Sequence, residues 1–400
     1  MRPRPRFRPR KNGDHAQLDR LLGSGGRRRG LGPKADPKLG VVWLLGCAIG
    51  WVLIHHRFGF SGAFRRLLED RDPRPFYPLI LLLTLLLVGS SVLLSLQEPF
   101  GLPLRLLKAP LNLTNAGGAF FFGVGMVMAG RCGSGTLASA SRPNAAFTLT
   151  LLGLVAGVFT ASLARPWLEN RSPLGLPPVQ LLKILPLPAA LALQLGLVGL
   201  LVLGVWAWSR KDLRLPWVAE PKLLQGALGL AALALAVFVV TGEPWKVLWG
   251  FALTGAHLAH AAGWTPESSE FWATPARSAL LSSPSQWWQH DAVVIDLGVI
   301  AGAWITGWLA TKNKTKERSQ EAFALQALDG RPIAAPPAKP WPFLAGGLLM
   351  GFGGFLAYGC NVSGFLGGVM SFSLHGWLWL VAALAGAASW IQLERRLHPD

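Results

Sequence analysis

The feature that most limits the folds open to this chain is a set of long stretches without any charged side chain. No Lys, Arg, Asp or Glu occurs from residue 340 to residue 393, and shorter uncharged stretches cover 143–164, 184–209 and 223–242. A helix that crosses a bilayer needs about 20 predominantly apolar residues. The sequence therefore predicts an all-α polytopic membrane protein surrounded by membrane lipid.

Composition and charge argue against two other classes of protein. Only 14% of the residues are charged and 51% are hydrophobic, whereas a soluble domain carries about 25% charged residues. The net charge of +18 is unevenly distributed, because residues 1–38 hold twelve Lys or Arg and three Asp. A soluble enzyme and a nucleic-acid-binding domain are both close to excluded.

The chain divides into a basic tail and one membrane domain. Residues 1–38 are dominated by Arg, Pro and Gly, which cannot bury a core, so we expect a disordered tail. Lys and Arg prefer the cytoplasmic side of a membrane, and this rule places the tail there together with the basic loops 209–222 and 311–340. Residues 39–400 are expected to form a single transmembrane domain.

Apolar segments of two kinds follow one another along this domain. Glycine inside a membrane helix permits close packing or a break, and a break is tolerated only where protein or a cavity covers the freed backbone. The Gly-rich segments are therefore candidates for short broken or re-entrant helices, and they lie at 117–130, 247–262 and 343–372. Full spans are expected at 41–56, 76–96, 144–164, 185–208, 223–242, 291–310 and 376–391.

An internal repeat relates two of the Gly-rich segments. With an offset of 228 residues, Cys132 aligns with Cys360, and three glycines before each Cys also align. Each copy is an apolar helix that ends at the Cys and a small polar turn, and a fainter copy has Gly59 at the Cys position. Such repeats are typical of transporters. The expected parts are the half-repeats 40–170 and 220–395, with a linker span at 185–208.

The two Cys turns are candidate substrate-binding elements. A helix broken inside the membrane exposes backbone N–H groups that can hold an anion. A thiol is a weak, polarisable donor and suits a soft, sulfur-containing anion better than a hard oxyanion. Helix packing is the alternative role of these residues, but the repeated register favours a site. The candidates are Cys132, Gly133, Ser134, Gly135 and Thr136 in one turn and Cys360, Asn361, Ser363 and Gly364 in the other.

Several other residues leave alternatives open. Cys47 has no counterpart in the repeat and is interpreted as a packing residue. Asp296 falls inside an expected span, where it is either functional or interfacial. Arg131 either adds positive charge to an anion path or pairs with a phosphate head group, and Trp377 and Trp379 are interpreted as interface anchors.

No cofactor or metal is expected: His257 and His260 lie three residues apart but have no third ligand nearby in sequence, so they are interpreted as structural or interfacial. The absence of a phosphate-binding loop argues against ATP-driven transport by this chain alone.

These residues resemble a known family. The segments 118–136 (GAFFFGVGMVMAGRCGSGT) and 346–364 (GGLLMGFGGFLAYGCNVSG) are similar to the two Cys motifs of the YeeE/YedE family. Its members are bacterial transporters of sulfur compounds, with thiosulfate uptake as the best-known activity. The segment 50–66 is similar to the family's first motif. The resemblance covers most of 40–395 and excludes the basic tail.

The resemblance implies a multi-pass transporter of the bacterial inner membrane, with short broken helices that meet at a central constriction. It implies that Cys132 and Cys360 contact the passing anion through S–H hydrogen bonds, with thiosulfate as the leading candidate for this anion. The first motif usually has Cys where this chain has Gly59, so one of three relay thiols is missing. Some relatives work with a small cytoplasmic sulfur-carrier protein, which the resemblance implies as a partner.

Three hypotheses about the function remain. The first is uptake of a small sulfur-containing anion through a path lined by thiols, without enzymatic activity. The second is a membrane thiol enzyme in which Cys132 or Cys360 takes up sulfane sulfur as a persulfide. No obvious general base accompanies either Cys in sequence, since His375 is fifteen residues past Cys360. The third is a channel-like scaffold without sulfur chemistry.

Overall fold

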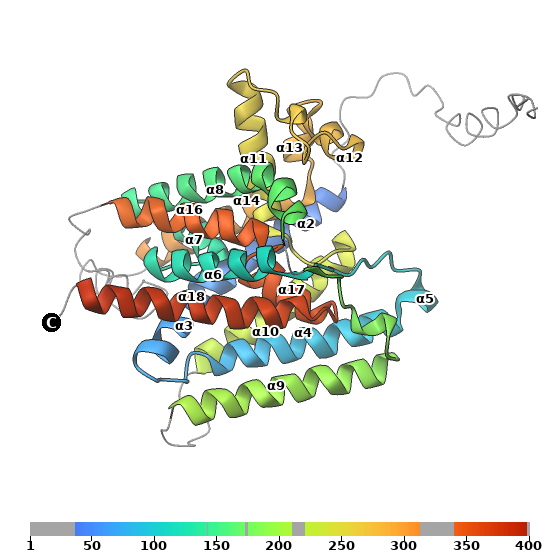
Figure 1. The fold of residues 1–400 in the computed structure, drawn as a ribbon, viewed down its shortest axis with the longest axis vertical. Helices are drawn as coiled ribbons and strands as arrows, with labels where there is room; N and C mark the ends of the chain where they lie inside the picture. Colours follow the sequence, from blue (N-terminus) through green and yellow to red (C-terminus); the bar gives the residue numbers. More distant parts are fainter. Residues whose placement is uncertain (1–36, 142, 173–174, 210–220, 313–339, 398–400) are drawn as a thin grey trace, which may run out of the picture. The chain divides into compact units, whose positions relative to one another are not determined.

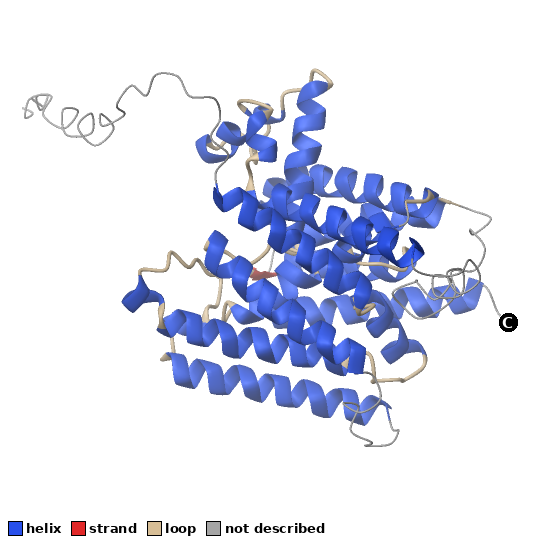
Figure 2. Ribbon diagram, turned by 180° about the vertical axis from the view of Figure 1, so that it is seen from behind, coloured by secondary structure: helices blue, strands red, loops and turns tan. Residues whose placement is uncertain are grey.

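The computed structural model describes residues 37–141, 143–172, 175–209, 221–312 and 340–397. Within these residues the chain is almost entirely helical, and one short antiparallel sheet pairs β1 (Leu111–Asn112) with β2 (Gly175–Leu176) (Figures 1 and 2). Nine helical segments of the described chain are long and apolar enough to cross a membrane. The prediction of an all-α polytopic membrane protein is confirmed.

Each of the seven expected full spans falls on one long helix. These helices are α2 (Pro37–His55), α4 (Tyr77–Ser95), α8 (Ala145–Asn170), α9 (Leu187–Ser209), α10 (Pro221–Thr241), α14 (Asp291–Lys312) and α18 (His375–Leu397). The three Gly-rich segments contain α6 (Leu113–Met128), α11 (Val247–Ala261) and α16 (Trp341–Leu356). Most of the predicted tail lies outside the described residues, since α2 begins at Pro37.

Short helices and single turns connect the long helices. The short helices are α3 (Phe60–Glu69), α5 (Gln97–Phe100), α7 (Gly133–Ala138), α12 (Pro275–Ser278), α13 (Ser285–Trp288) and α17 (Gly367–Met370). The single turns are η1 (Ser139–Ser141), η2 (Leu181–Lys183), η4 (Pro266–Ser268), η5 (Ala279–Leu281) and η6 (Asn361–Leu366), of which η6 is π-helical. Helix α3 is not predicted by hydropathy, because it is amphipathic: it buries Phe60 and Phe64, while Arg65 pairs with Glu69.

Four long helices form one layer in the order α8, α16, α6 and α18, so that the helices flanking the first Cys turn (α8 and α6) alternate with those flanking the second (α16 and α18) (Figure 1). Glycines set the close approach of α6 and α16. A side-chain carbon on Gly118 would lie 2.6 Å from the Gly353 carbonyl oxygen, and one on Gly125 would lie 2.5 Å from the Gly346 carbonyl oxygen. The 228-residue offset maps Gly118 onto Gly346 and Gly125 onto Gly353, so each contact is the copy of the other.

Helices α2 and α14 run side by side in the same direction. At their beginnings Lys38 forms an ion pair with Asp291 at 2.6 Å. Further along, a side-chain carbon on Gly46 would lie 2.5 Å from the Ile295 carbonyl oxygen, and one on Gly302 would lie 2.0 Å from the Cys47 carbonyl oxygen. The described chain therefore starts at the end of the bundle opposite Lys312. The charge rule places the start of α2 and the end of α14 both in the cytoplasm, so only one of these two helix ends can follow it if α14 crosses the membrane.

We expect Lys38→Cys and Lys312→Cys to react with a membrane-impermeant maleimide from opposite sides. Both side chains lie at the exposed ends of helices that run in parallel. The measurement compares labelling in right-side-out and inside-out vesicles, with the unsubstituted protein as control for the half-buried Cys47, since Cys132 and Cys360 are buried. Labelling of both variants from the same side would contradict the parallel arrangement of two spanning helices.

Candidate functional site

Three spanning segments break with the same backbone turn. The residue at the break has a left-handed conformation, with φ of 53° at Arg57, 68° at Gly130 and 62° at Tyr358. Two residues later the chain is extended and starts a new helix, which is α3, α7 or η6. A left-handed residue ends a helix and redirects the chain. The two Cys copies and the fainter Gly59 copy therefore share one local geometry.

Cys132 is the cap residue of α7. Its sulfur accepts a hydrogen bond from the Gly135 backbone N–H at 3.4 Å and lies 3.3 Å from the Ser134 hydroxyl oxygen. The Phe60 backbone amide, at the start of α3, also lies against this thiol. The first N–H groups of a helix have no partner within the helix. Cys132 therefore lies where the first N–H groups of α3 and α7, which have no partner within their own helices, come together.

Cys360 occupies the matching position before η6. Its backbone N–H donates to the Ser363 hydroxyl at 3.2 Å, and the Gly364 N–H donates to the Cys360 carbonyl at 2.7 Å. The residue before it, Gly359, accepts a hydrogen bond from the Trp379 indole at 2.9 Å. Three hydrogen bonds therefore hold the second turn and fix the position of its thiol.

The two turns meet inside the protein. Cys132 is 2% exposed and Cys360 is 1% exposed. A side-chain carbon added to Gly133 would lie 3.8 Å from the Cys360 sulfur and 3.7 Å from the Leu248 side chain, so the start of α11 also reaches this point. Asn361 is fully buried, and its amide nitrogen lies 3.5 Å from the Met126 sulfur. The fold brings together the two thiols that the repeat predicted.

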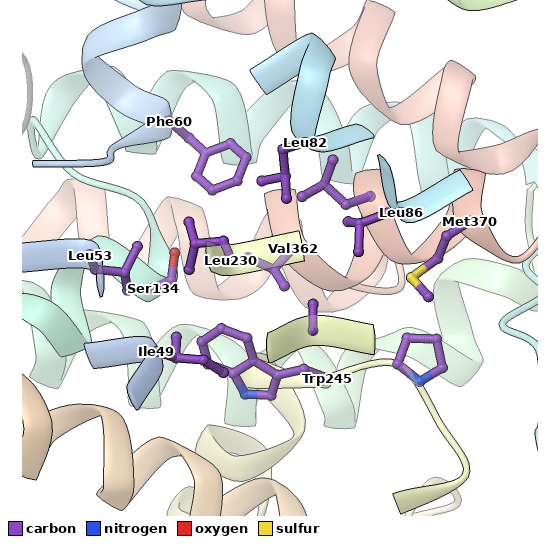
Figure 3. A pocket seen from close by; sticks show the side chains of 13 residues that line it. Ile49, Leu53, Phe60, Leu82, Leu86, Ser134, Leu230, Trp245, Val362 and Met370 are labelled. Carbon is purple, nitrogen blue, oxygen red and sulfur yellow. The ribbon is translucent and has the colours of Figure 1, made fainter. Parts of the chain in front are cut away.

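A small apolar cavity lies beside the turns, and Figure 3 shows the side chains around it. Its volume is about 40 Å³, which is space for roughly three waters. Its walls come from α2, α3, α4, α7, α10, η6 and α17 and from the segment before α11, with Phe60, Ser134, Trp245, Val362 and Met370 among the lining residues. Ser134 connects this cavity to the Cys132 thiol through its hydroxyl group.

Only one of the predicted site residues lines the cavity. Ser134 does so directly, whereas Cys132 and Cys360 are not among the residues that line it. Gly59 precedes the lining residue Phe60 and has extended backbone, with φ of −145°. The predicted residues Gly133, Gly135, Thr136, Asn361, Ser363 and Gly364 are all buried in the two turns.

Two side chains near the site were not identified as site residues from the sequence. Trp379 is fully buried and stacks on Phe365, so its interpretation as an interface anchor is wrong: the aromatic belt rule describes exposed Trp, and this indole supports the Cys360 turn. Trp245 lines the cavity and donates to Asp296 at 3.1 Å. Nothing in their sequence context separates either Trp from the others.

The structure shows the positions of two residues whose roles the sequence left open. Asp296 is 5% exposed, which excludes the exposed interfacial alternative. Cys47 is half-buried on α2 and its backbone packs on Gly302 of α14. A packing role for Cys47 stays a prediction.

The hydrogen-bond partners of both thiols are neutral groups, although the buried Arg131 precedes Cys132 in the chain. In the described chain these partners are backbone amides and the hydroxyls of Ser134 and Ser363. His375 is buried and shares a hydrogen bond of 2.7 Å with the Ser373 hydroxyl, not with a thiol. The described residues also contain no group of three His, Cys, Asp or Glu that could hold a metal ion. Such a site offers weak donors and no strong base.

The comparisons with known proteins agree with the family resemblance. A family model described as "Sulphur transport" matches residues 55–389. The chain is 27% identical to "Thiosulfate transporter TsuA" of Spirochaeta thermophila over 384 residues, covering 89% of this chain and 100% of that protein. It is 25% identical to the Escherichia coli protein of the same name, covering 88% of this chain and 94% of that protein. Because the family model matches most of the chain, this protein belongs to the sulphur-transport (YeeE/YedE) family of membrane proteins.

Proposed function

We propose that the protein takes up a small sulfur-containing anion through a path that passes the Cys132 and Cys360 thiols. Thiosulfate is the first candidate for this anion. The observation that carries the proposal is the pair of buried thiols at the starts of α7 and η6, beside a cavity. The names of the two full-length relatives supply the substrate. The bacterial inner membrane is the proposed location, in line with the apolar helices and the family.

The chemistry of the turns fits such an anion. A thiosulfate ion has hard oxygens and one soft terminal sulfur, and it loses its hydration when it enters a narrow path. Backbone N–H groups at a helix start replace part of that hydration, and thiols add weak donors that match the soft sulfur. The apolar cavity walls accept sulfur more readily than they accept oxygen, which favours thiosulfate over sulfate.

Uptake of labelled thiosulfate into proteoliposomes tests the function. We expect saturable uptake, strong competition by unlabelled thiosulfate, and weak competition by sulfate and selenite. Vesicles without the protein are the control. Uptake that sulfate inhibits as well as thiosulfate would exclude recognition through thiols, and no uptake above the control would refute the proposal.

Mass spectrometry separates transport from the thiol-enzyme alternative. A sulfurtransferase would carry a persulfide on Cys132 or Cys360 after exposure to substrate. The neutral partners of both thiols favour reversible hydrogen bonding, so we expect unmodified Cys132 and Cys360 together with accumulated substrate. The small cytoplasmic sulfur-carrier partner stays an expectation from the family resemblance.

Gly59→Cys is expected to raise thiosulfate uptake or lower its apparent KM, because it adds a thiol to the third turn. The residue two positions on, Ser61, now donates to the Met126 carbonyl at 3.2 Å, whereas its counterpart Ser134 contacts the Cys132 thiol. A φ of −145° allows any side chain at this position without backbone strain. The measurement is the KM for thiosulfate in the same vesicles.

Gly59→Ala is the matched control, since it adds the side-chain carbon without the thiol. A gain in Gly59→Cys that Gly59→Ala lacks would support a third thiol station. Equal loss in both variants would mean that the position requires glycine for space, and better sulfate transport in Gly59→Cys would count against recognition by thiols.

A further inference from the structure

Asp296 is a buried acidic side chain in the middle of apolar helices. It lies on α14 and is 5% exposed. One carboxyl oxygen accepts a hydrogen bond from the Trp245 indole at 3.1 Å, and the other has no partner in the described chain. Glycine at position 250 makes room for it, since a side-chain carbon there would lie 2.3 Å from the unpartnered oxygen. The absence of a side chain at Gly250 therefore leaves the space that this carboxyl group occupies.

The charged groups around Asp296 are engaged elsewhere. Lys38 and Asp291 pair with each other at the start of α14. Lys246 pairs with Glu243 in the segment before α11. The other titratable groups on or beside the neighbouring elements are Cys47 and His55 on α2, Arg131 and Cys132 before α7, His257 and His260 on α11, and His290 before α14. In the described residues His257 bonds to the Leu280 carbonyl, His260 pairs with Glu267 and His290 accepts from the Trp249 indole.

A buried carboxyl group such as that of Asp296 can avoid the free-energy cost of a buried charge by binding a proton. A buried carboxylate without a cationic partner is strongly disfavoured, and binding a proton removes its charge. Acidic residues inside membrane segments commonly belong to ion or proton pathways. Asp296 meets the structural conditions for a site that exchanges a proton during a transport cycle.

Trp245 connects this carboxyl group to the cavity. Its indole N–H points to Asp296, while its ring forms part of the cavity wall together with Ser134 and Val362 (Figure 3). The Ser134 hydroxyl reaches the Cys132 thiol at 3.3 Å. One indole ring therefore separates the carboxyl group from the cavity where we place the anion path.

We propose that Asp296 is the proton-binding site that couples anion transport to a proton gradient, with Trp245 as the connecting side chain. The inference rests on the proposed function, since it concerns the same path. An anion in the cavity repels a negative charge across the Trp245 ring, so the anion is held best when Asp296 carries a proton. The proton and the anion then move through the protein in the same direction.

The experiment uses the full-length protein in proteoliposomes with the membrane voltage held at zero by potassium and valinomycin. An outside-acid gradient of about one pH unit, coupled to one proton, supports about a tenfold thiosulfate accumulation ratio. We expect the wild-type protein to reach an accumulation of this order and to acidify a dye-loaded lumen when thiosulfate is added. Asp296→Asn is expected to lose both responses while it still exchanges labelled for unlabelled thiosulfate, and Trp245→Phe is expected to weaken them.

Asp291→Asn is the matched control, because it removes an acidic side chain from the exposed start of the same helix and should leave the gradient-driven accumulation unchanged. Proton-driven accumulation that survives in Asp296→Asn overturns the inference, as does accumulation driven by a sodium gradient and not by a pH gradient. Exchange in the wild type without any response to pH also overturns it, yet leaves the proposed function standing. Absence of thiosulfate exchange in the wild type refutes the proposed function itself.

Discussion

Cys132→Ala and Cys360→Ala should each lower thiosulfate uptake by about tenfold to a hundredfold. Each change removes a donor from a site that holds a dehydrated anion, and a lost partner in a buried site costs about 1–3 kcal/mol, with about 1.4 kcal/mol for each factor of ten. Both side chains are almost fully buried in turns held by other contacts, so the amount of folded protein should change little. The rate of uptake by purified protein, normalised to the folded fraction, is the measurement.

Cys47→Ala is the control for this pair, because it removes a thiol that lies on α2 and belongs to neither turn. It should transport at nearly the wild-type rate. Wild-type uptake in both Cys132→Ala and Cys360→Ala would refute the thiol site. A loss in Cys47→Ala as large as the loss in Cys132→Ala would show that the wrong thiols have been chosen.

Gly118→Ala should destabilise the protein strongly, with a loss at or above the 1–3 kcal/mol that overpacking typically costs. The added carbon would lie 2.6 Å from the Gly353 carbonyl oxygen and 2.8 Å from the Ala357 backbone nitrogen. Both are backbone atoms of α16, so the two helices would have to separate. The midpoint of thermal unfolding in detergent measures this effect.

Gly117→Ala is the control from the neighbouring position of the same helix. An added carbon there has no atom within 4 Å outside the helix itself. Surface changes of this kind usually stay within about 0.5 kcal/mol, so its unfolding midpoint should remain near that of the wild type. Equal midpoints for Gly118→Ala and Gly117→Ala would mean that α6 and α16 do not approach as closely as the structure has them.

The spanning helices could be predicted from the sequence because bilayer length and apolar composition are properties of single segments. The uncharged stretch from residue 340 to residue 393 contains α16, the Cys360 turn and most of α18. Helix α3 could not be found in this way, because its Arg and Glu residues lower the hydropathy while its buried face is visible only after folding. The division of the chain into two half-repeats, 40–170 and 220–395, stays a prediction.

The sequence also identified the two Cys turns, because a repeated spacing records a repeated local structure. The left-handed residues at Gly130 and Tyr358, each two positions before a Cys, have the geometry that such a repeat requires. The third copy is harder to recognise, since Arg57 takes the left-handed conformation and Gly59 replaces the Cys. A binding role for these residues stays a prediction that the Cys variants test.

The sequence by itself determined the membrane class, the long helices and the breaks at the two Cys turns, since each depends on neighbouring residues along the chain. Only the tertiary structure decided which side chains meet. Trp379 supports a turn twenty residues earlier, and Trp245 donates to Asp296, which lies 51 residues later on α14. Such contacts depend on how α14, α18 and their neighbours pack, and helix packing is set by many small contacts between segments that are distant in sequence.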